Sequence, residues 1–174
     1  MKKIIILSLI LLTGSWTFGQ GVTEMKTLPS VNIKTLDGQP FNTSQIQNDG
    51  KPIVISFWAL WCKPCKKEME AYNENYEDWQ EETGVKIYAV SIDDARSTAK
   101  VLPFVRGHDW QMEVLLDPNG DFKRAMNVNL IPHTFLLDGT GKVVYQHTSY
   151  YEGLEDEFFE LIKKVAAGEE IPKH

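Results

Sequence analysis

The stretch SFWALWCKPC, residues 56–65, holds both cysteines of this 174-residue chain. Cys62 and Cys65 are separated by two residues, after an apolar run and before a charged segment. A disulfide with this spacing closes a very small ring, so it would constrain the unfolded chain very little. A structural zinc site needs four ligands, but there is no second C-x-x-C and the four histidines show no ligand-like spacing. A redox-active pair, without metal or cofactor, is therefore the better interpretation.

The segments on either side of the pair predict a strand followed by a helix. Residues 51–59 (KPIVISFWA) are almost continuously apolar, which is typical of a strand buried on both faces. From Cys62 to about Glu82, large apolar residues recur every three or four positions, which predicts a helix that Gly84 ends. Free N–H groups and the dipole at a helix N-terminus stabilise a thiolate. We therefore expect Cys62 to be the nucleophile and Cys65, one turn further on, to resolve the mixed disulfide.

Strands and helices alternate along the rest of the chain. Residues 31–46 predict a β-hairpin, because Asp37-Gly38 is a strong turn signal between alternating residues. Further strands are expected at 85–93, 113–117, 133–138 and 143–148, and helices at 95–106, 121–128 and 154–167. This order predicts an α/β sandwich in which the 138–142 turn adds an antiparallel pair at one end.

The first nineteen residues are expected to be a signal peptide. Lys2 and Lys3 precede an apolar run at 4–12 that is short for a membrane span, and small residues follow it. Cleavage after Gly19 would leave residues 20–174 as one domain, and an uncleaved anchor is the alternative. The apolar fraction of 43% and the charged fraction of 24% are those of an ordinary globular protein. A net charge of −6 argues against nucleic acid or an anionic membrane as the main partner.

The segment FWALWCKPCKKEM (57–69) resembles the thioredoxin superfamily, and specifically its exported TlpA/ResA-like thiol-disulfide oxidoreductases. The resemblance runs from Leu28 to about Val165 and includes LPSVNIKTLDGQPF (28–41) and IPHTFLLDGTGKVV (131–144). It implies a thioredoxin fold for residues 20–174, with a central mixed β-sheet flanked by helices and an added N-terminal β-hairpin. It also implies a periplasmic or other extracytoplasmic location.

The resemblance also implies roles for residues around the cysteine pair. A cis Pro132 would face the pair and hold the backbone of Ile131 where an extended client chain could bind. Together with Trp61 and Pro64, these are the expected substrate-binding residues, although Trp61 could instead serve packing. Glu68 lies at the spacing of a glutamate implicated in proton handling in the ResA-like group, and it is the third expected catalytic residue beside the two cysteines. The alternative for Glu68 is a surface carboxylate in an acid-rich helix.

The chain departs from the family pattern at several positions. Ser56 occupies the place of the buried aspartate of thioredoxins proper, which leaves Glu68 as the only nearby carboxylate candidate. Glu70 replaces a frequent proline, which puts a kink of the helix in doubt. Family members usually carry threonine around the cis-proline, whereas here Ile131 and His133 flank it. His133 either tunes the pH response or is a strand residue turned away. Lys63 either supports the thiolate or is simply solvated.

The leading functional hypothesis is a monomeric protein-disulfide reductase of the cell envelope. By resemblance, its clients would be exported proteins with disulfides, such as apocytochromes c, and a membrane thiol protein would supply electrons. Proline at the third motif position, Pro64, resembles reducing members. The alternatives are an oxidant or isomerase of the same fold, a thiol peroxidase, which would need threonine at Ala59, and a copper metallochaperone, whose cysteines are spaced more widely. A non-catalytic interaction module is a further alternative.

Overall fold

The computed structural model describes residues 27–171. The expected signal peptide, residues 1–19, lies outside this range and stays a prediction. None of the helices within residues 27–171 combines the length and hydrophobicity needed to cross a membrane.

A seven-stranded mixed sheet forms the centre of the molecule, with strand order β2-β1-β5-β4-β3-β6-β7. Its strands are β1 (Asn32–Thr35), β2 (Pro40–Asn42), β3 (Ile53–Trp58), β4 (Lys86–Ser91), β5 (Glu113–Leu116), β6 (His133–Leu137) and β7 (Val143–Thr148). The three strands β3, β4 and β5 are parallel, whereas β1, β2, β6 and β7 pair antiparallel at the two sides. The expected N-terminal hairpin is confirmed as β1 and β2, and it extends the sheet by pairing with β5.

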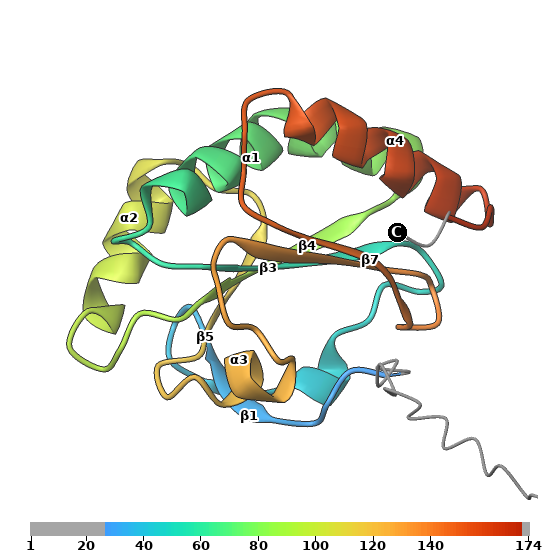
Figure 1. Cartoon of the computed structure of the whole chain (residues 1–174). Coiled ribbons are helices and arrows are strands. Elements are labelled where there is room, and N and C mark those ends of the chain that lie inside the picture. Colours follow the sequence, from blue (N-terminus) through green and yellow to red (C-terminus); the bar gives the residue numbers. More distant parts are fainter. Residues whose placement is uncertain (1–26, 172–174) are drawn as a thin grey trace, which may run out of the picture.

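Helices cover both faces of this sheet. They are α1 (Lys63–Thr83), α2 (Val101–Gly107), α3 (Asp121–Ala125) and α4 (Leu154–Ala166), with 3₁₀ turns η1 (Thr43–Gln45) and η2 (Thr98–Lys100). Figure 1 shows α1 and α4 on one face of the sheet and α3 on the other. Every residue of β3 is buried. Two consecutive residues of this strand, Phe57 and Trp58, belong to two different hydrophobic core clusters, one on each face of the sheet. Successive side chains of a strand point to opposite faces, which explains the unbroken apolar run.

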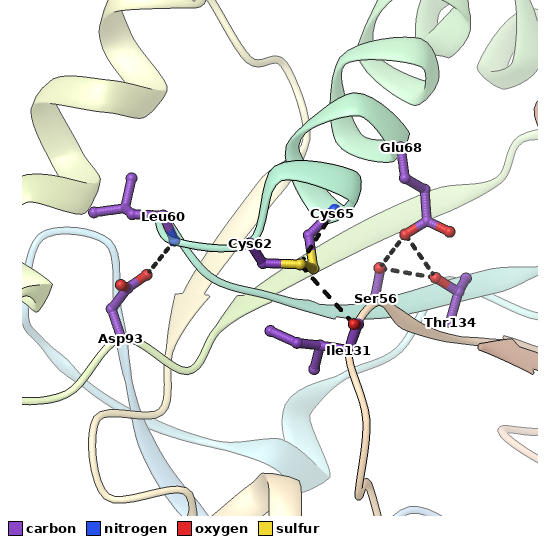
Figure 2. Close-up of a disulfide and its surroundings, with 8 residues drawn as sticks. All are labelled: Ser56, Leu60, Cys62, Cys65, Glu68, Asp93, Ile131 and Thr134. Atoms are coloured by element: carbon purple, nitrogen blue, oxygen red, sulfur yellow. Dashed lines mark hydrogen bonds between the residues drawn. A yellow bond between two sulfur atoms is a disulfide. The ribbon is translucent and has the colours of Figure 1, made fainter. Parts of the chain in front are cut away.

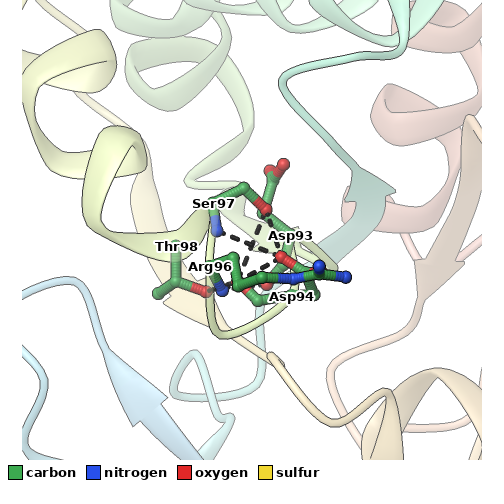
Figure 3. Close-up of polar contacts among 5 residues, drawn as sticks. All are labelled: Asp93, Asp94, Arg96, Ser97 and Thr98. Carbon is green, nitrogen blue, oxygen red and sulfur yellow. Dashed lines mark hydrogen bonds and ion pairs between the residues drawn. The ribbon is translucent and has the colours of Figure 1, made fainter.

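Two predicted helices are shorter in the structure. The segment expected to be helical from residue 95 first forms a turn, and its helix α2 begins only at Val101. Asp94 closes this turn (Figure 3), because its Oδ1 accepts hydrogen bonds from the backbone N–H of Ser97 at 3.0 Å and of Arg96 at 3.1 Å. The hydrogen bonds from Ser97 lower the pKa of Asp94. Aspartate side chains compete with the helix in this way.

The other shortened helix is α3, which was expected to reach residue 128. It ends at Ala125 because Asn127 has a φ of 54°, outside the helical region. Asparagine tolerates this conformation better than most residues. The remaining expected strands and helices are present with ends that differ by a few residues.

Candidate active site

Cys62 and Cys65 form a disulfide at the beginning of α1. Cys62 is the N-cap residue of this helix, and its sulfur accepts a hydrogen bond from the backbone N–H of Cys65 at 3.3 Å. Pro64 lies at the second helical position, where a missing N–H costs nothing. Cys62 is 5% exposed and Cys65 is fully buried, so only the Cys62 sulfur is open to attack on another molecule.

The segment before β6 faces this disulfide (Figure 2). The Ile131-Pro132 peptide bond is cis, as the resemblance implied, and the carbonyl oxygen of Ile131 lies 3.9 Å from the Cys62 sulfur. Trp61, directly before Cys62, is 69% exposed, and Leu130, directly before Ile131, is 70% exposed. The packing alternative for Trp61 is therefore wrong, because this side chain lies at the surface beside the disulfide.

Glu68 is fully buried on the inner side of α1. Its Oε2 is 3.1 Å from the hydroxyl oxygen of Ser56 and 3.2 Å from that of Thr134. Its Oε1 is 3.2 Å from the hydroxyl of Tyr72 and 2.8 Å from Nε2 of His147. The alternative of a surface glutamate is therefore wrong. Four polar groups converge on one carboxyl group, one helical turn from the disulfide.

The register of three adjacent strands produces this cluster. Ser56 on β3 pairs with Thr134 on β6, and Thr134 pairs with His147 on β7. Residues paired across antiparallel strands share a face of the sheet, so the three side chains form one row. Glu68 lies over that row from α1, and Figure 2 shows it directed at Ser56 and Thr134. Ser56 occupies the position of the buried aspartate of thioredoxins proper, and in this chain it contacts the carboxyl group of Glu68 on the helix instead.

Burial changes the acid–base properties of two side chains near this row. Burial, reinforced by the neighbouring carboxyl group of Glu68, raises the pKa of Tyr72 well above its usual value. Burial lowers the pKa of His133, although its hydrogen bond with Gln146 opposes the shift. The ring of His133 stacks on Phe135, which belongs to the core cluster on the other face of the sheet from Glu68. His133 is thus the strand residue turned away from the carboxyl cluster.

Asp93 is a second buried carboxylate that the sequence did not reveal. Its Oδ2 accepts a hydrogen bond from the backbone N–H of Leu60 at 2.9 Å and one from the hydroxyl of Ser91 at 2.9 Å. Figure 2 shows it beside the segment that leads to Cys62. The prediction that Glu68 is the only nearby carboxylate is therefore wrong.

The remaining predicted positions are peripheral. Lys63 and Pro64 are exposed. The helix α1 continues without a break from Lys63 through Glu70 to Thr83. Within residues 27–171, no group of three or more His, Cys, Asp or Glu side chains is arranged to hold a metal ion.

Comparison with known proteins now identifies the family. The AhpC/TSA family model matches residues 25–146. A thiol-disulfide oxidoreductase ResA from Bacillus thuringiensis is 31% identical over 140 residues, which cover 80% of this chain and 77% of that protein. This chain is a ResA-like member of the AhpC/TSA family. This ResA-like chain is also similar to an uncharacterised thioredoxin-like protein from Porphyromonas gingivalis, whose structure was determined in solution. The two sequences are 49% identical, and the structures superpose with a TM-score of 0.73 over 84% of this chain and 96% of that one.

A more distant solved structure supports the fold alone. The crystal structure of a putative thiol:disulfide interchange protein DsbE from Chlorobium tepidum is 24% identical with a TM-score of 0.70, over 81% of this chain and 96% of that one. The thioredoxin fold predicted from the motif is therefore confirmed for this ResA-like chain.

Proposed function

We propose that this ResA-like thiol-disulfide oxidoreductase reduces disulfides in exported proteins, with Cys62 as the nucleophile and Cys65 as the resolving cysteine. The observation that carries the proposal is the placement of the Cys62 sulfur. It is the accessible sulfur of the pair, it caps a helix N-terminus, and it lies beside the backbone of Ile131. Helix N-terminal N–H groups favour the thiolate, which is the attacking species.

The reaction proceeds through a mixed disulfide. The Cys62 thiolate attacks one sulfur of the client disulfide, and the other client sulfur leaves with the electron pair. Cys65 then loses its proton and attacks Cys62, which releases the first client sulfur as a thiolate. Two protons from solvent complete the client dithiol. The client gains two electrons, and Cys62 and Cys65 become the disulfide seen in the structure.

Exposed apolar side chains support a binding surface for an extended client segment. Trp61 is exposed directly before Cys62, and Leu130 is exposed directly before Ile131, whose carbonyl oxygen lies 3.9 Å from the Cys62 sulfur. Ile131 and Pro132 offer backbone beside Cys62, and Pro64 is exposed two residues after Cys62. Apolar side chains that are exposed close together on a surface often mark a binding site. Exported proteins with a reducible cysteine pair, apocytochromes c among them, are the proposed clients.

The cellular setting of the proposal rests on the N-terminal sequence. Lys2, Lys3 and the apolar run that follows favour export, so the enzyme would work outside the cytoplasm. Because that environment is oxidising, a reductase there needs electrons from a membrane thiol protein. A monomer is the proposed form. Nucleic acid has no role in this scheme.

The reduction potential of the Cys62/Cys65 couple tests the direction of electron flow. It is measured by equilibrating the protein in dithiol buffers and trapping free thiols. A value near or below about −250 mV, in the range of thioredoxin, supports a reductase. A value near about −120 mV would instead identify an oxidant, and the proposal would be wrong in direction.

A trapping experiment tests the two cysteine roles. Cys65→Ala should accumulate a mixed disulfide between Cys62 and a disulfide-bearing client, visible on a non-reducing gel. The matched variant Cys62→Ala should accumulate none, because the remaining sulfur is fully buried. Equal trapping by both variants would contradict the assignment of nucleophile and resolving cysteine.

A further inference from the structure

His147 joins the carboxyl cluster from β7, and the two-cysteine mechanism assigns it no task. Its Nε2 lies 2.8 Å from Oε1 of Glu68, and its side chain is 9% exposed. The ring meets Phe158 edge-on at a centroid distance of 5.2 Å and Tyr145 at 5.8 Å. An imidazole enclosed by aromatic rings and directed at a buried carboxyl group is positioned to control that group.

The surroundings of the second ring nitrogen indicate the protonation state of His147. Its Nδ1 is buried and has no hydrogen-bond partner among residues 27–171. An imidazolium would bury an N–H donor there without an acceptor, at a substantial desolvation cost. The neutral tautomer with its proton on Nε2 avoids this and donates to Oε1 of Glu68.

The hydrogen bonds around Glu68 then favour its carboxylate form. The donors at Oε1 are His147 and Tyr72, and Ser56 donates to Oε2. The Thr134 hydroxyl lies 2.8 Å from Ser56 and 3.2 Å from Oε2, so its single proton can go to either oxygen. When it goes to Ser56, Oε2 keeps a lone pair that can accept a proton.

Cys65 precedes Glu68 by three residues on α1. Residues three apart on a helix lie on the same face, and both Cys65 and Glu68 are fully buried on the inner face of α1. We propose that His147 is a positioning residue that keeps Glu68 a carboxylate and thereby ready to take the proton of Cys65 in the resolving step. This inference rests on the reductase function proposed above and adds a residue to it.

The resolving step moves one proton to Glu68 and one electron pair to the client sulfur. The Cys65 thiol transfers its proton to Oε2 of Glu68, and the resulting thiolate attacks the sulfur of Cys62. The bond between Cys62 and the client breaks, and its electron pair leaves on the client sulfur. That thiolate is protonated from solvent, and Glu68 later releases its proton to solvent. The net result is a disulfide in the enzyme and a reduced client.

Other titratable groups around the pair are neutral near pH 7. Burial is the main cause that raises the pKa of Tyr72 on α1, Tyr145 on β7 and Tyr150 before α4, so these phenols stay protonated. Burial lowers the pKa of His133 on β6, so this imidazole is neutral.

Two acidic side chains in the first turn of α4 are engaged elsewhere. Glu155 accepts a hydrogen bond from Tyr150, and Glu157 accepts one from Tyr151. Neither forms a hydrogen bond or ion pair with Glu68 or His147 in the part of the chain that the structure describes. Glu68 is therefore the buried charge that His147 controls.

The decisive experiment measures the resolving step in His147→Leu and His147→Gln. Each variant is mixed, in its reduced form, with a peptide that contains one disulfide, and decay of the mixed disulfide is followed by rapid quenching. Loss of a hydrogen bond to a charged group should slow the His147→Leu decay by about tenfold or more near pH 7. His147→Gln, whose amide can donate to Glu68, should stay within about threefold of wild type.

The pH profile separates positioning from a structural effect. Without the His147 donor the carboxylate is less stabilised, so the rise of the resolving rate with pH should move to higher pH in His147→Leu. At still higher pH the variant should approach wild type, because Cys65 then ionises without help. A uniformly slower rate at every pH would contradict the inference and indicate a damaged fold instead.

Further variants locate the effect. In the Cys65→Ala background, which reports only mixed-disulfide formation, His147→Leu should change the rate by less than about twofold, since it acts on the later step. In the Glu68→Gln background it should likewise have almost no additional effect, because its target is gone. His108→Leu is the matched control, since His108 is exposed directly after α2 and stacks on Phe104.

The outcomes separate this inference from the proposed function. If wild type forms no mixed disulfide with the peptide, the reductase proposal itself fails. If wild type reacts but His147→Leu resolves at the wild-type rate, only the role of His147 is overturned. An equal slowing by His147→Leu in the Glu68→Gln background would overturn it as well.

Discussion

Asp93 fixes the backbone just before the nucleophile through a single carboxylate oxygen. Its Oδ2 accepts hydrogen bonds from Leu60 and Ser91, and the residue is 1% exposed. Leu60 stands two residues before Cys62, in the turn that joins β3 to α1. A buried carboxylate that accepts backbone N–H groups holds such a turn in one conformation. The position of the Cys62 sulfur therefore depends on a residue that has no part in the chemistry.

The substitution Asp93→Ala should lower the free energy of unfolding of the oxidised protein by about 1–3 kcal/mol. The reason is that it leaves the Leu60 N–H and the Ser91 hydroxyl without an acceptor. Asp93→Asn retains an acceptor oxygen and should recover part of this loss. Urea denaturation followed by tryptophan fluorescence provides the measurement. Unfolding of Asp93→Ala at the wild-type midpoint and slope would show that the turn does not depend on this carboxylate.

Some of these residues could be predicted from the sequence and others could not. Glu68 follows Cys65 by three positions and precedes Tyr72 by four, so it lies in the buried stripe of the helix. The burial of Glu68 could therefore be predicted from this spacing, although the acidic residues around it also fit a surface position. The contacts of Thr134 and His147 with Glu68 could not be predicted, because they depend on the register of three strands. Strand register is set by tertiary packing rather than by local sequence.

At the scale of elements, α1 is defined by a residue at each end. Cys62 caps its N-terminus, and Gly84 ends it with a φ of 69° and an N–H that donates to the carbonyl of Gln80 at 2.8 Å. Both ends could be predicted from the sequence, because the cysteine motif and glycine have strong local preferences. The start of α2 was not predicted, since the Asp94 turn competes with a helix that otherwise fits the pattern.

A pair of glycine substitutions tests the C-terminal end of α1. Gly84→Ala should destabilise the protein by about 1–2 kcal/mol, because its left-handed conformation disfavours a Cβ atom. That Cβ would also press against the side chain of Lys51. Gly107→Ala is the matched control: it ends α2 with open space around the new Cβ, and it should be neutral or slightly stabilising. Thermal unfolding of both variants gives the comparison, and equal effects would contradict a special role for Gly84.

At the scale of the whole molecule, the site lies where three parts of the fold meet. The end of β3, the start of α1 and the segment before β6 come together here, and both cysteines belong to the same core cluster as Trp58 and Tyr72. The mixed sheet with an antiparallel pair at one end was predicted from the order of the elements and is confirmed. Pairing of the N-terminal hairpin with β5 was not predicted, because contacts between strands distant in sequence leave no local signal.

The stability of the whole fold should depend on pH through His133. Burial lowers the pKa of His133 in the folded protein, whereas in the unfolded chain it returns to about 6.5. At pH values below about 6.5 the unfolded state binds a proton that the folded state does not yet bind, so the free energy of unfolding falls as pH decreases. The slope from this one group is at most about 1.4 kcal/mol per pH unit, and it vanishes below the pKa of the folded state.

His133→Gln removes this titration and keeps a polar group beside Gln146. The variant should therefore lose less stability than wild type between pH 7 and pH 5, as measured by urea denaturation of the oxidised proteins. Nuclear magnetic resonance of the imidazole C–H groups supplies an independent reading, with a His133 midpoint below about 6.5 in the folded protein and near that value in urea. A folded midpoint equal to the unfolded one would contradict the prediction, because the histidine would then make no contribution to the pH dependence of stability. A folded midpoint above the unfolded one would reverse its sign, and the fold would gain stability as this histidine becomes protonated.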